Sequence, residues 1–225
     1  MKTTFQMLAY TIFSIAFFGL LLFWPAGTFD YWQAWVFIAV FVVSAMVPTI
    51  YLAVKYPDAL QRRTQPGPFA ETRTLQKLIY VGIILTVVAA GVVSALDHRF
   101  GWSTVPTAVV VLGNVLVVVG LGFAAWARVY LGRNWSAAVT LKHDHELIRS
   151  GPYRWVRNPI YTGILIALAG SALARGQWSG VLAVAIAFGS FWYKARLEER
   201  VMHEAFGAEY DAYKREVRSL IPFVL

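Results

Sequence analysis

The sequence has 225 residues, of which 58% are hydrophobic and 14% are charged, and its formal net charge is +8. An average soluble domain carries about 25% charged residues, so this composition excludes an ordinary soluble chain and a disordered one. There is no cysteine, which excludes disulfide frameworks, thiolate zinc sites and cysteine nucleophiles.

The apolar residues occur in runs, and a helix that spans a membrane needs about 20 of them. Four long runs are found at Leu8–Trp24, Trp32–Val54, Leu78–Leu96 and Pro106–Tyr130. Two shorter runs, Ile160–Ala174 and Ser179–Tyr193, flank the polar turn Arg175–Trp178 and predict a tight helical hairpin. The first run exceeds the usual core of a signal peptide, so we expect it to be retained. The sequence therefore predicts an all-α integral membrane protein with about six membrane helices.

The basic residues indicate how these helices are oriented, because cytoplasmic loops are enriched in Lys and Arg. With six spans and an inside amino terminus, only Arg99 and Arg175 of the 20 basic residues fall outside. We therefore expect both termini to be cytoplasmic. The positive charge would then lie against the headgroups of the lipid bilayer, and no soluble basic module predicts nucleic-acid binding.

Two long polar segments flank the hairpin, Leu131–Asn158 before it and Lys194–Leu225 after it. Folding of the hairpin brings both segments to the same membrane face, where they can build one site. We accordingly divide the chain into a transmembrane helical scaffold, residues 1–130, and a catalytic region, residues 131–225.

Local signals refine these segments. A C-terminal amphipathic helix is expected from about Tyr193 to Val217, and Asn158 is expected to cap a helix whose first turn contains Pro159. His143 and His145 alternate with Asp144, but no third ligand stands at a characteristic spacing, so no metal site is predicted.

The run from His145 to Gly163 reads HELIRSGPYRWVRNPIYTG. It resembles the cofactor motif of the isoprenylcysteine carboxyl methyltransferase and phospholipid methyltransferase superfamily. The tail segments Arg196–Glu199, Phe206–Tyr213 and Leu220–Phe223 match the carboxy-terminal pattern of that superfamily in the same order.

The resemblance implies a membrane enzyme that transfers a methyl group from S-adenosylmethionine to a lipophilic or small-molecule acceptor at the cytoplasmic face. By position, it implies cofactor contacts for His145, Leu147, Ile148, Tyr153, Asn158, Pro159, Tyr161, Glu198 and Glu199. It places Arg157 and Arg196 on the acceptor side, with Arg196 and Glu199 as catalytic residues. The superfamily often has histidine where this chain has Asn158, and asparagine does not titrate near pH 7, so general-base chemistry is not expected there.

Methyl transfer from a sulfonium is an in-line displacement, for which alignment and exclusion of water supply much of the acceleration. A carboxylate or thiolate acceptor needs no strong base. An amine must lose a proton, and His145, Glu198 and Glu199 are candidates to take it. The acceptor therefore remains open among an isoprenylcysteine-type carboxylate, a thiol and a lipid amine.

Two other functions remain open. A membrane reductase of the sterol-reductase type would bind NADPH, and Arg149, Arg154 and Arg157 offer a cluster for its 2′-phosphate. A non-catalytic helix bundle, such as a channel or a scaffold, is disfavoured because no charged residue falls at mid-membrane. The sequence does not determine the oligomeric state.

Overall fold

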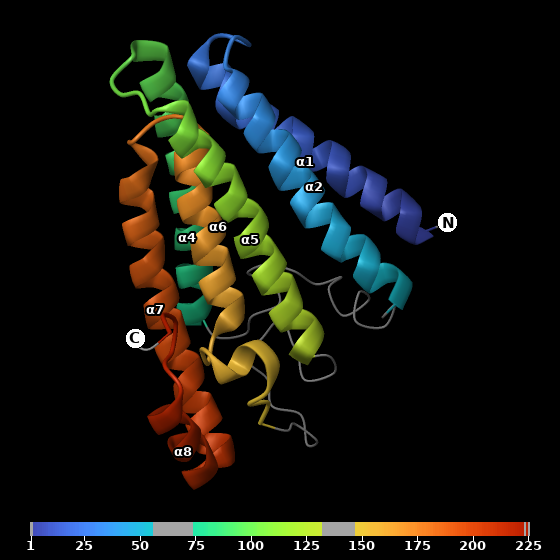
Figure 1. Cartoon of the computed structure of the whole chain (residues 1–225), viewed down its shortest axis with the longest axis vertical. Helices are drawn as coiled ribbons and strands as arrows, with labels where there is room; N and C mark the ends of the chain where they lie inside the picture. Colours follow the sequence, from blue (N-terminus) through green and yellow to red (C-terminus); the bar gives the residue numbers. More distant parts are fainter. Residues whose placement is uncertain (1, 56–73, 132–146, 223, 225) are drawn as a thin grey trace.

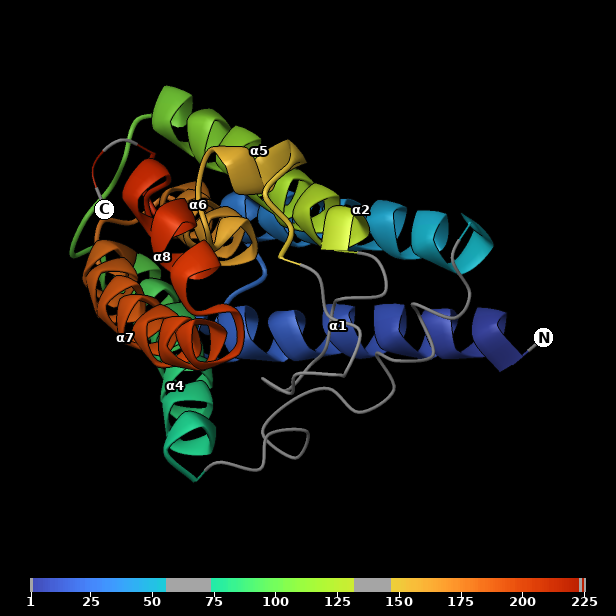
Figure 2. The same ribbon diagram turned by 90° about the horizontal axis from the view of Figure 1, so that it is seen from below.

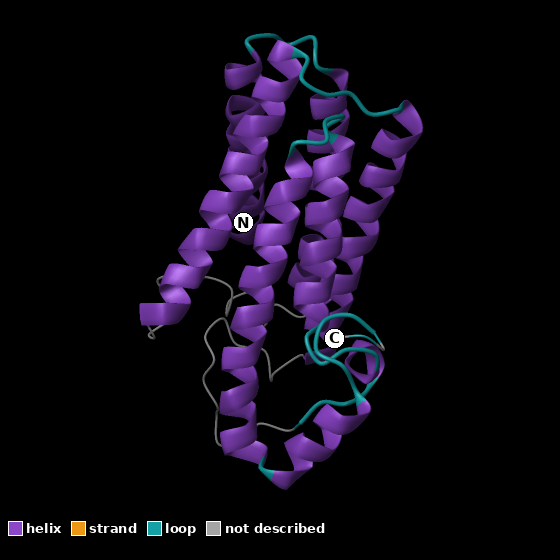
Figure 3. Cartoon of the chain, turned by 90° about the vertical axis from the view of Figure 1, so that its left-hand side faces the viewer, coloured by secondary structure: helices purple, strands orange, loops and turns teal. Residues whose placement is uncertain are grey.

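The computed structural model describes residues 2–55, 74–131, 147–222 and 224, and all regular structure in these ranges is helical (Figures 1 and 3). The helices are α1 Lys2–Ala26, α2 Trp32–Lys55, α4 Thr74–Phe100, α5 Thr107–Leu131, the 3₁₀ helix η2 Gly151–Arg154, α6 Pro159–Ala174, α7 Gly180–Phe206 and α8 Ala208–Glu216. The predicted all-α class is confirmed.

The four predicted long spans correspond to α1, α2, α4 and α5, each of which is long and apolar enough to cross a membrane. Their large side chains face outward in many places: Phe13 is 66% exposed, Leu85 62% and Val111 56%. Such surfaces are stable in hydrocarbon and costly in water. The chain is therefore an integral, multi-pass membrane protein, whose shared core lies where α1 and α2 meet α4, α5 and α6.

The predicted hairpin is present, but its second helix is longer than expected. After α6 and the turn at Arg175, α7 runs without a break from Gly180 to Phe206. The tail helix predicted from Tyr193 to Val217 is therefore wrong in its start and in its continuity, although α8 ends at Glu216, close to the predicted end. No helix-breaking residue separates the apolar run from the charged one, so α7 continues until Gly207, where a φ of +50° ends the helix and α8 begins.

Helices α5 and α6 pack closely against each other along their length. A Cβ added to Gly120 would lie 2.5 Å from the carbonyl oxygen of Gly163 and from the nitrogen of Ala167. One added to Gly170 would lie 2.5 Å from the carbonyl oxygen of Gly113. Small residues permit such close approach between membrane helices. The start of α6 is thereby fixed beside the end of α5.

A polar layer closes the end of the bundle that holds the α6–α7 turn. The hydroxyl of Tyr31, which precedes α2, lies 2.7 Å from the carbonyl oxygen of Arg175 and 2.7 Å from Oε1 of Gln177. The Tyr31 ring stacks on His98 with a centroid distance of 3.9 Å. These contacts hold the hairpin turn against the scaffold, far from the end where α8 lies (Figure 1).

Candidate active site

The segment before α6 and the tail after α8 lie side by side at one end of the bundle. The backbone nitrogen of Arg157 donates to the carbonyl oxygen of Arg218 at 2.8 Å, and that of Asn158 donates to Ser219 at 3.0 Å. Seen from below, α8 lies between α7 and the start of α6 (Figure 2). The two polar segments therefore meet, as the hairpin predicts.

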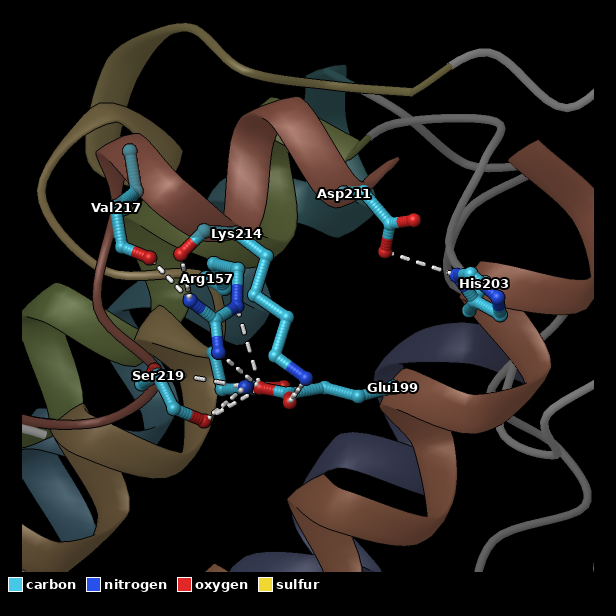
Figure 4. A network of polar contacts seen from close by, with 8 residues as sticks. Arg157, Glu199, His203, Asp211, Lys214, Val217 and Ser219 are labelled. Carbon is cyan, nitrogen blue, oxygen red and sulfur yellow. Dashed lines mark hydrogen bonds and ion pairs between the residues drawn. The ribbon is translucent and has the colours of Figure 1, made fainter. Parts of the chain in front are cut away.

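Glu199 on α7 is the centre of a buried polar network (Figure 4). The residue is 4% exposed, and its Oε1 accepts hydrogen bonds from Arg157 Nη2 at 2.7 Å, Arg157 Nε at 3.2 Å and Ser219 Oγ at 2.8 Å. Arg157 Nη1 in turn donates to the carbonyl oxygens of Lys214, at 3.2 Å, and Val217. The arginine thus joins α7, α8 and the tail through one side chain.

The second oxygen of Glu199 is used differently. Oε2 is buried and accepts no hydrogen bond from the part of the chain that the structure describes. The ammonium of Lys214 lies 3.8 Å away, close enough for an ion pair but too far for a hydrogen bond. A buried carboxylate oxygen with no donor is costly, and a donor on a ligand would satisfy it.

A groove of about 700 Å³ lies between α7 and α8, and Glu199 is part of its lining. It is lined by Trp192, Tyr193, Arg196, Glu199, Arg200, His203, Glu204, Tyr210, Asp211 and Lys214. The α7 members recur at spacings of three, four and seven residues, so they occupy one face of that helix. The groove combines an aromatic end with charged side chains of both signs, a lining suited to a polar ligand that carries an aromatic ring.

Tyr210 adds a neutral donor to this lining. Burial, and next the charge of Glu199, raise the pKa of the Tyr210 phenol above its ordinary value. The phenol therefore keeps its proton at physiological pH. Arg196 lies in the groove with its guanidinium 5.1 Å from the Trp192 ring, held by a cation–π contact and available to a ligand at its other edge.

Glu198 and Tyr161 form a separate pair. The Tyr161 hydroxyl donates to Glu198 Oε1 at 2.6 Å, and the Lys194 ammonium lies 2.9 Å from the same oxygen. Glu198 is not part of the groove lining. Of the two neighbouring glutamates, Glu198 therefore contacts α6 through Tyr161, and Glu199 belongs to the network around Arg157.

Tyr153, Asn158 and Pro159 lie against protein rather than in the groove lining. The Tyr153 hydroxyl donates to the carbonyl oxygen of Ala127 at 3.4 Å, and burial raises its pKa, so the phenol stays neutral. Pro159 begins α6 as predicted. The predicted capping by Asn158 is wrong for its side chain, which makes no cap hydrogen bond and instead donates to Ser219 Oγ at 3.0 Å. The adjacent tail offers the side-chain amide of Asn158 an acceptor, so this side chain is bound to Ser219 instead of capping the first turn of α6.

Leu147 and Ile148 are half-buried before η2, while His145 lies outside the described residues, as do His143, Asp144 and Phe223. Sequence reasoning missed Ser219, Lys214, Tyr210 and His203 as parts of this region. Ser219 follows no pattern of its own. His203 could have been found from Glu199, because residues four apart share a helix face.

Comparisons with known proteins find similarity in the part of the chain that includes α7 and Glu199. Residues 108–209 match the family model described as phospholipid methyltransferase, a range that contains η2, α6 and α7 with Glu199. The chain is 33% identical over 128 residues to a protein-S-isoprenylcysteine O-methyltransferase of Saccharomyces cerevisiae, covering 56% of this chain and 54% of that one. Over about half of its length, the chain is therefore similar to phospholipid methyltransferases and protein-S-isoprenylcysteine O-methyltransferases.

The relatives that the chain matches differ in the methyl acceptor that their names carry. The methanethiol S-methyltransferase of Mycobacterium tuberculosis is 32% identical over 124 residues, which cover 55% of this chain and 46% of the relative. A structure of the eukaryotic intramembrane Ras methyltransferase, an isoprenylcysteine carboxyl methyltransferase, superimposes with a TM-score of 0.59 at 17% identity and covers 98% of this chain and 84% of that one. That likeness concerns the fold alone. The chain spans about half the length of the yeast and mycobacterial relatives that it matches.

Proposed function

We propose that the protein transfers a methyl group from S-adenosylmethionine to a lipophilic or membrane-accessible acceptor, such as an isoprenylcysteine-type carboxylate, a thiol or a lipid amine. Residues 131–225 would form the catalytic region and residues 1–130 the scaffold. With six spans and both termini cytoplasmic, as the basic residues favour, the groove would open on the cytoplasmic side.

The observation that carries this proposal is the half-satisfied carboxylate of Glu199 beside the groove. Arg157 and Ser219 hold Oε1, so the position of the carboxylate is fixed while Oε2 remains available. The amino group or the ribose hydroxyls of S-adenosylmethionine would supply the missing donor.

The groove also fits the donor in size and chemistry. Its volume of about 700 Å³ lies within the range of roughly 300–1,000 Å³ typical of small-molecule sites. Trp192, Tyr193 and Tyr210 offer faces on which adenine can stack. S-adenosylmethionine brings a methyl group activated by its sulfonium charge, so the protein needs chiefly to orient the reactants and exclude water.

The three arginines considered for NADPH are each engaged with other groups of the protein. Arg157 is bound to Glu199 and two carbonyls, Arg149 donates to the Glu209 carbonyl and lies 5.4 Å from the Tyr213 ring, and Arg154 lies 5.7 Å from the Trp155 ring. Recognition of a 2′-phosphate needs guanidinium groups that can pair with it, and Arg157 is already committed to Glu199. This arrangement favours the methyltransferase over the reductase.

Calorimetric titration of the detergent-purified protein with S-adenosylmethionine and, separately, with NADPH tests the proposal. We expect saturable binding of S-adenosylmethionine only. Glu199→Gln removes the charge with little change of shape and should weaken that binding at least tenfold, about 1.4 kcal/mol. Glu216→Gln, at the exposed end of α8, is the matched control and should bind as the wild type does.

Each other result has a definite meaning. Binding of NADPH alone would replace the proposal with the reductase. If neither compound bound to folded protein, the non-catalytic bundle would be favoured. A tenfold loss in Glu198→Gln without loss in Glu199→Gln would move the cofactor contact to the side of Tyr161.

A further inference from the structure

His203 and Asp211 face each other across the break between α7 and α8. The His203 Nδ1 lies 2.9 Å from Oδ1 of Asp211, and both residues line the groove. His203 stands one helical turn after Glu199, and the close-up shows the pair across an opening from Glu199 and Lys214 (Figure 4). The histidine therefore shares the groove with the oxygen to which the cofactor is assigned.

The chemistry of this pair fixes where the histidine carries its proton. An ionised carboxylate only accepts hydrogen bonds, so Nδ1 must bear the hydrogen in a contact of this length. In the neutral imidazole, Nε2 is then the acceptor nitrogen. Among the described residues, the hydrogen bond of His203 is the one that Nδ1 makes to Asp211, and Nε2 has no such partner there. A neutral imidazole oriented by a carboxylate is the arrangement of a general base.

The other titratable groups around the groove are less suited to take a proton. They are Arg196, Glu199, Arg200 and Glu204 on α7, and Tyr210, Asp211 and Lys214 on α8. Glu199 is paired with Arg157, and Glu198 is paired with Lys194 outside the groove. Each of these two carboxylates already neutralises a cation, whereas Nε2 of His203 is unengaged.

We propose that His203, oriented by Asp211, is the general base of this protein and that its methyl acceptor is a lipophilic thiol. The proposal rests on the methyltransferase function proposed above. The acceptor sulfur gives its proton to Nε2 and forms the bond to the methyl carbon. The bond from that carbon to the sulfonium breaks, and its electron pair stays on the donor sulfur. His203, whose side chain is 57% exposed, then releases the proton to water.

The charges of the groove favour a thiol over an amine. Arg157 offsets the charge of Glu199, so the three cations Arg196, Arg200 and Lys214 exceed the two remaining acids of the lining, Glu204 and Asp211, by one charge. This positive excess disfavours an ammonium ion and stabilises the negative charge that develops on sulfur. A carboxylate acceptor is already ionised at neutral pH and has no proton to give. With a carboxylate acceptor, the His203–Asp211 pair would therefore have no proton to remove.

The decisive experiment compares dodecanethiol with dodecanoate, two acceptors that share one chain and differ in the reacting group. The full-length protein in detergent with S-adenosylmethionine should methylate the thiol. In His203→Asn, which keeps an N–H donor near Asp211, kcat for the thiol should fall about 100-fold at pH 7. The remaining rate should rise tenfold per pH unit, because only thiolate formed in water reacts. Glu216→Gln should leave the wild-type rates unchanged.

A readout independent of turnover comes from ¹⁵N-labelled histidine, of which the chain has four. His203→Asn identifies the signal of His203 by its loss. We expect the Nδ1–H tautomer in the wild type and its loss in Asp211→Asn, with a fall of about tenfold in kcat for the thiol. An Nε2–H tautomer in the wild type would overturn the proposal.

The outcomes separate this inference from the function on which it rests. If S-adenosylmethionine binds but only dodecanoate is methylated, or dodecylamine alone, or none of the three, the thiol proposal fails while cofactor binding stands. Absence of S-adenosylmethionine binding would remove both proposals. If His203→Asn lowers the midpoint of thermal unfolding but slows the thiol reaction less than twofold, the pair only fastens α8 to α7.

Discussion

Asp97 and Glu199 are buried carboxylates at opposite ends of the bundle, and their oxygens are used differently. Asp97 is 1% exposed, and both oxygens accept hydrogen bonds from Ser103, Oδ1 from the backbone nitrogen and Oδ2 from Oγ, each at 2.7 Å. Glu199 is 4% exposed, and Oε1 accepts three hydrogen bonds while Oε2 accepts none from the described residues.

The difference teaches how to tell a structural carboxylate from a binding one. The hydrogen bonds of Asp97 close the loop after α4 and give each of its oxygens a donor from within the chain, so neither oxygen needs a ligand. Glu199 is held just as firmly, yet it keeps one buried oxygen for a donor from outside the chain. The two ends should therefore respond differently to mutation, one in stability and the other in ligand binding.

The largest effect should come from the helix pair that joins the ends. Gly120→Val places a side chain where a Cβ would already lie 2.5 Å from the backbone of α6, so the helices must separate. We expect a loss of about 3 kcal/mol in the free energy of unfolding or failure to obtain monodisperse protein. Size-exclusion profiles and thermal unfolding in detergent measure this.

Gly122 provides the control for this prediction, because nothing lies within 4 Å of a Cβ added there. Gly122→Val on the same helix should change the unfolding midpoint by only a few degrees. Equal damage from both substitutions would show that the contact between α5 and α6 does not limit stability.

The next effect concerns the closed end alone. Asp97→Ala removes both acceptors from Ser103 and should lower the free energy of unfolding by about 2 kcal/mol, since hydrogen bonds to a charged group are typically worth roughly 1.5–3 kcal/mol. Binding of S-adenosylmethionine per folded molecule, measured by calorimetry, should stay within twofold of the wild type. Asp30→Asn, an exposed acid at the same end, should change neither quantity. Lost binding in the folded Asp97→Ala protein would refute the division between the ends.

The smallest effect should come from Ser219, which supplies one of three hydrogen bonds to Glu199. Ser219→Ala leaves both Arg157 contacts in place, so we expect about 1 kcal/mol of destabilisation and a threefold to tenfold weaker binding of S-adenosylmethionine. Ser94→Ala is the matched control, because the buried Ser94 hydroxyl has no partner among the described residues. Its removal should leave both quantities unchanged or raise stability slightly.

Much of the fold could be predicted from the sequence. The apolar runs placed α1, α2, α4 and α5 within a few residues, and the polar turn at Arg175 placed the hairpin. Hydrophobic length is a local property that adds up along the chain, so it can be read without knowing the neighbours. The end of the hairpin's second helix was misplaced, because continuation of α7 to Gly207 depends on the absence of a break rather than on a positive signal.

The site was predicted only in its outline. The resemblance brought Arg157 and Glu199 into one region, and the structure pairs them at 2.7 Å. It gave no means to separate Glu199 from Glu198, which the structure directs toward Tyr161.

By itself, then, the sequence determined the membrane class, the spans and the two polar segments that must share one end. Only the tertiary structure decided which oxygen of Glu199 lacks a hydrogen-bond donor among the described residues, that Ser219 and Lys214 approach this carboxylate, and that His203 meets Asp211. The physical reason is the separation along the sequence of the residues that interact. Hydrophobic runs and glycine turns act through neighbours in the chain, whereas Arg157 and Ser219 reach Glu199 from 42 and 20 residues away. Such contacts exist only after the helices have packed, and their direction depends on side-chain rotamers that the packing selects.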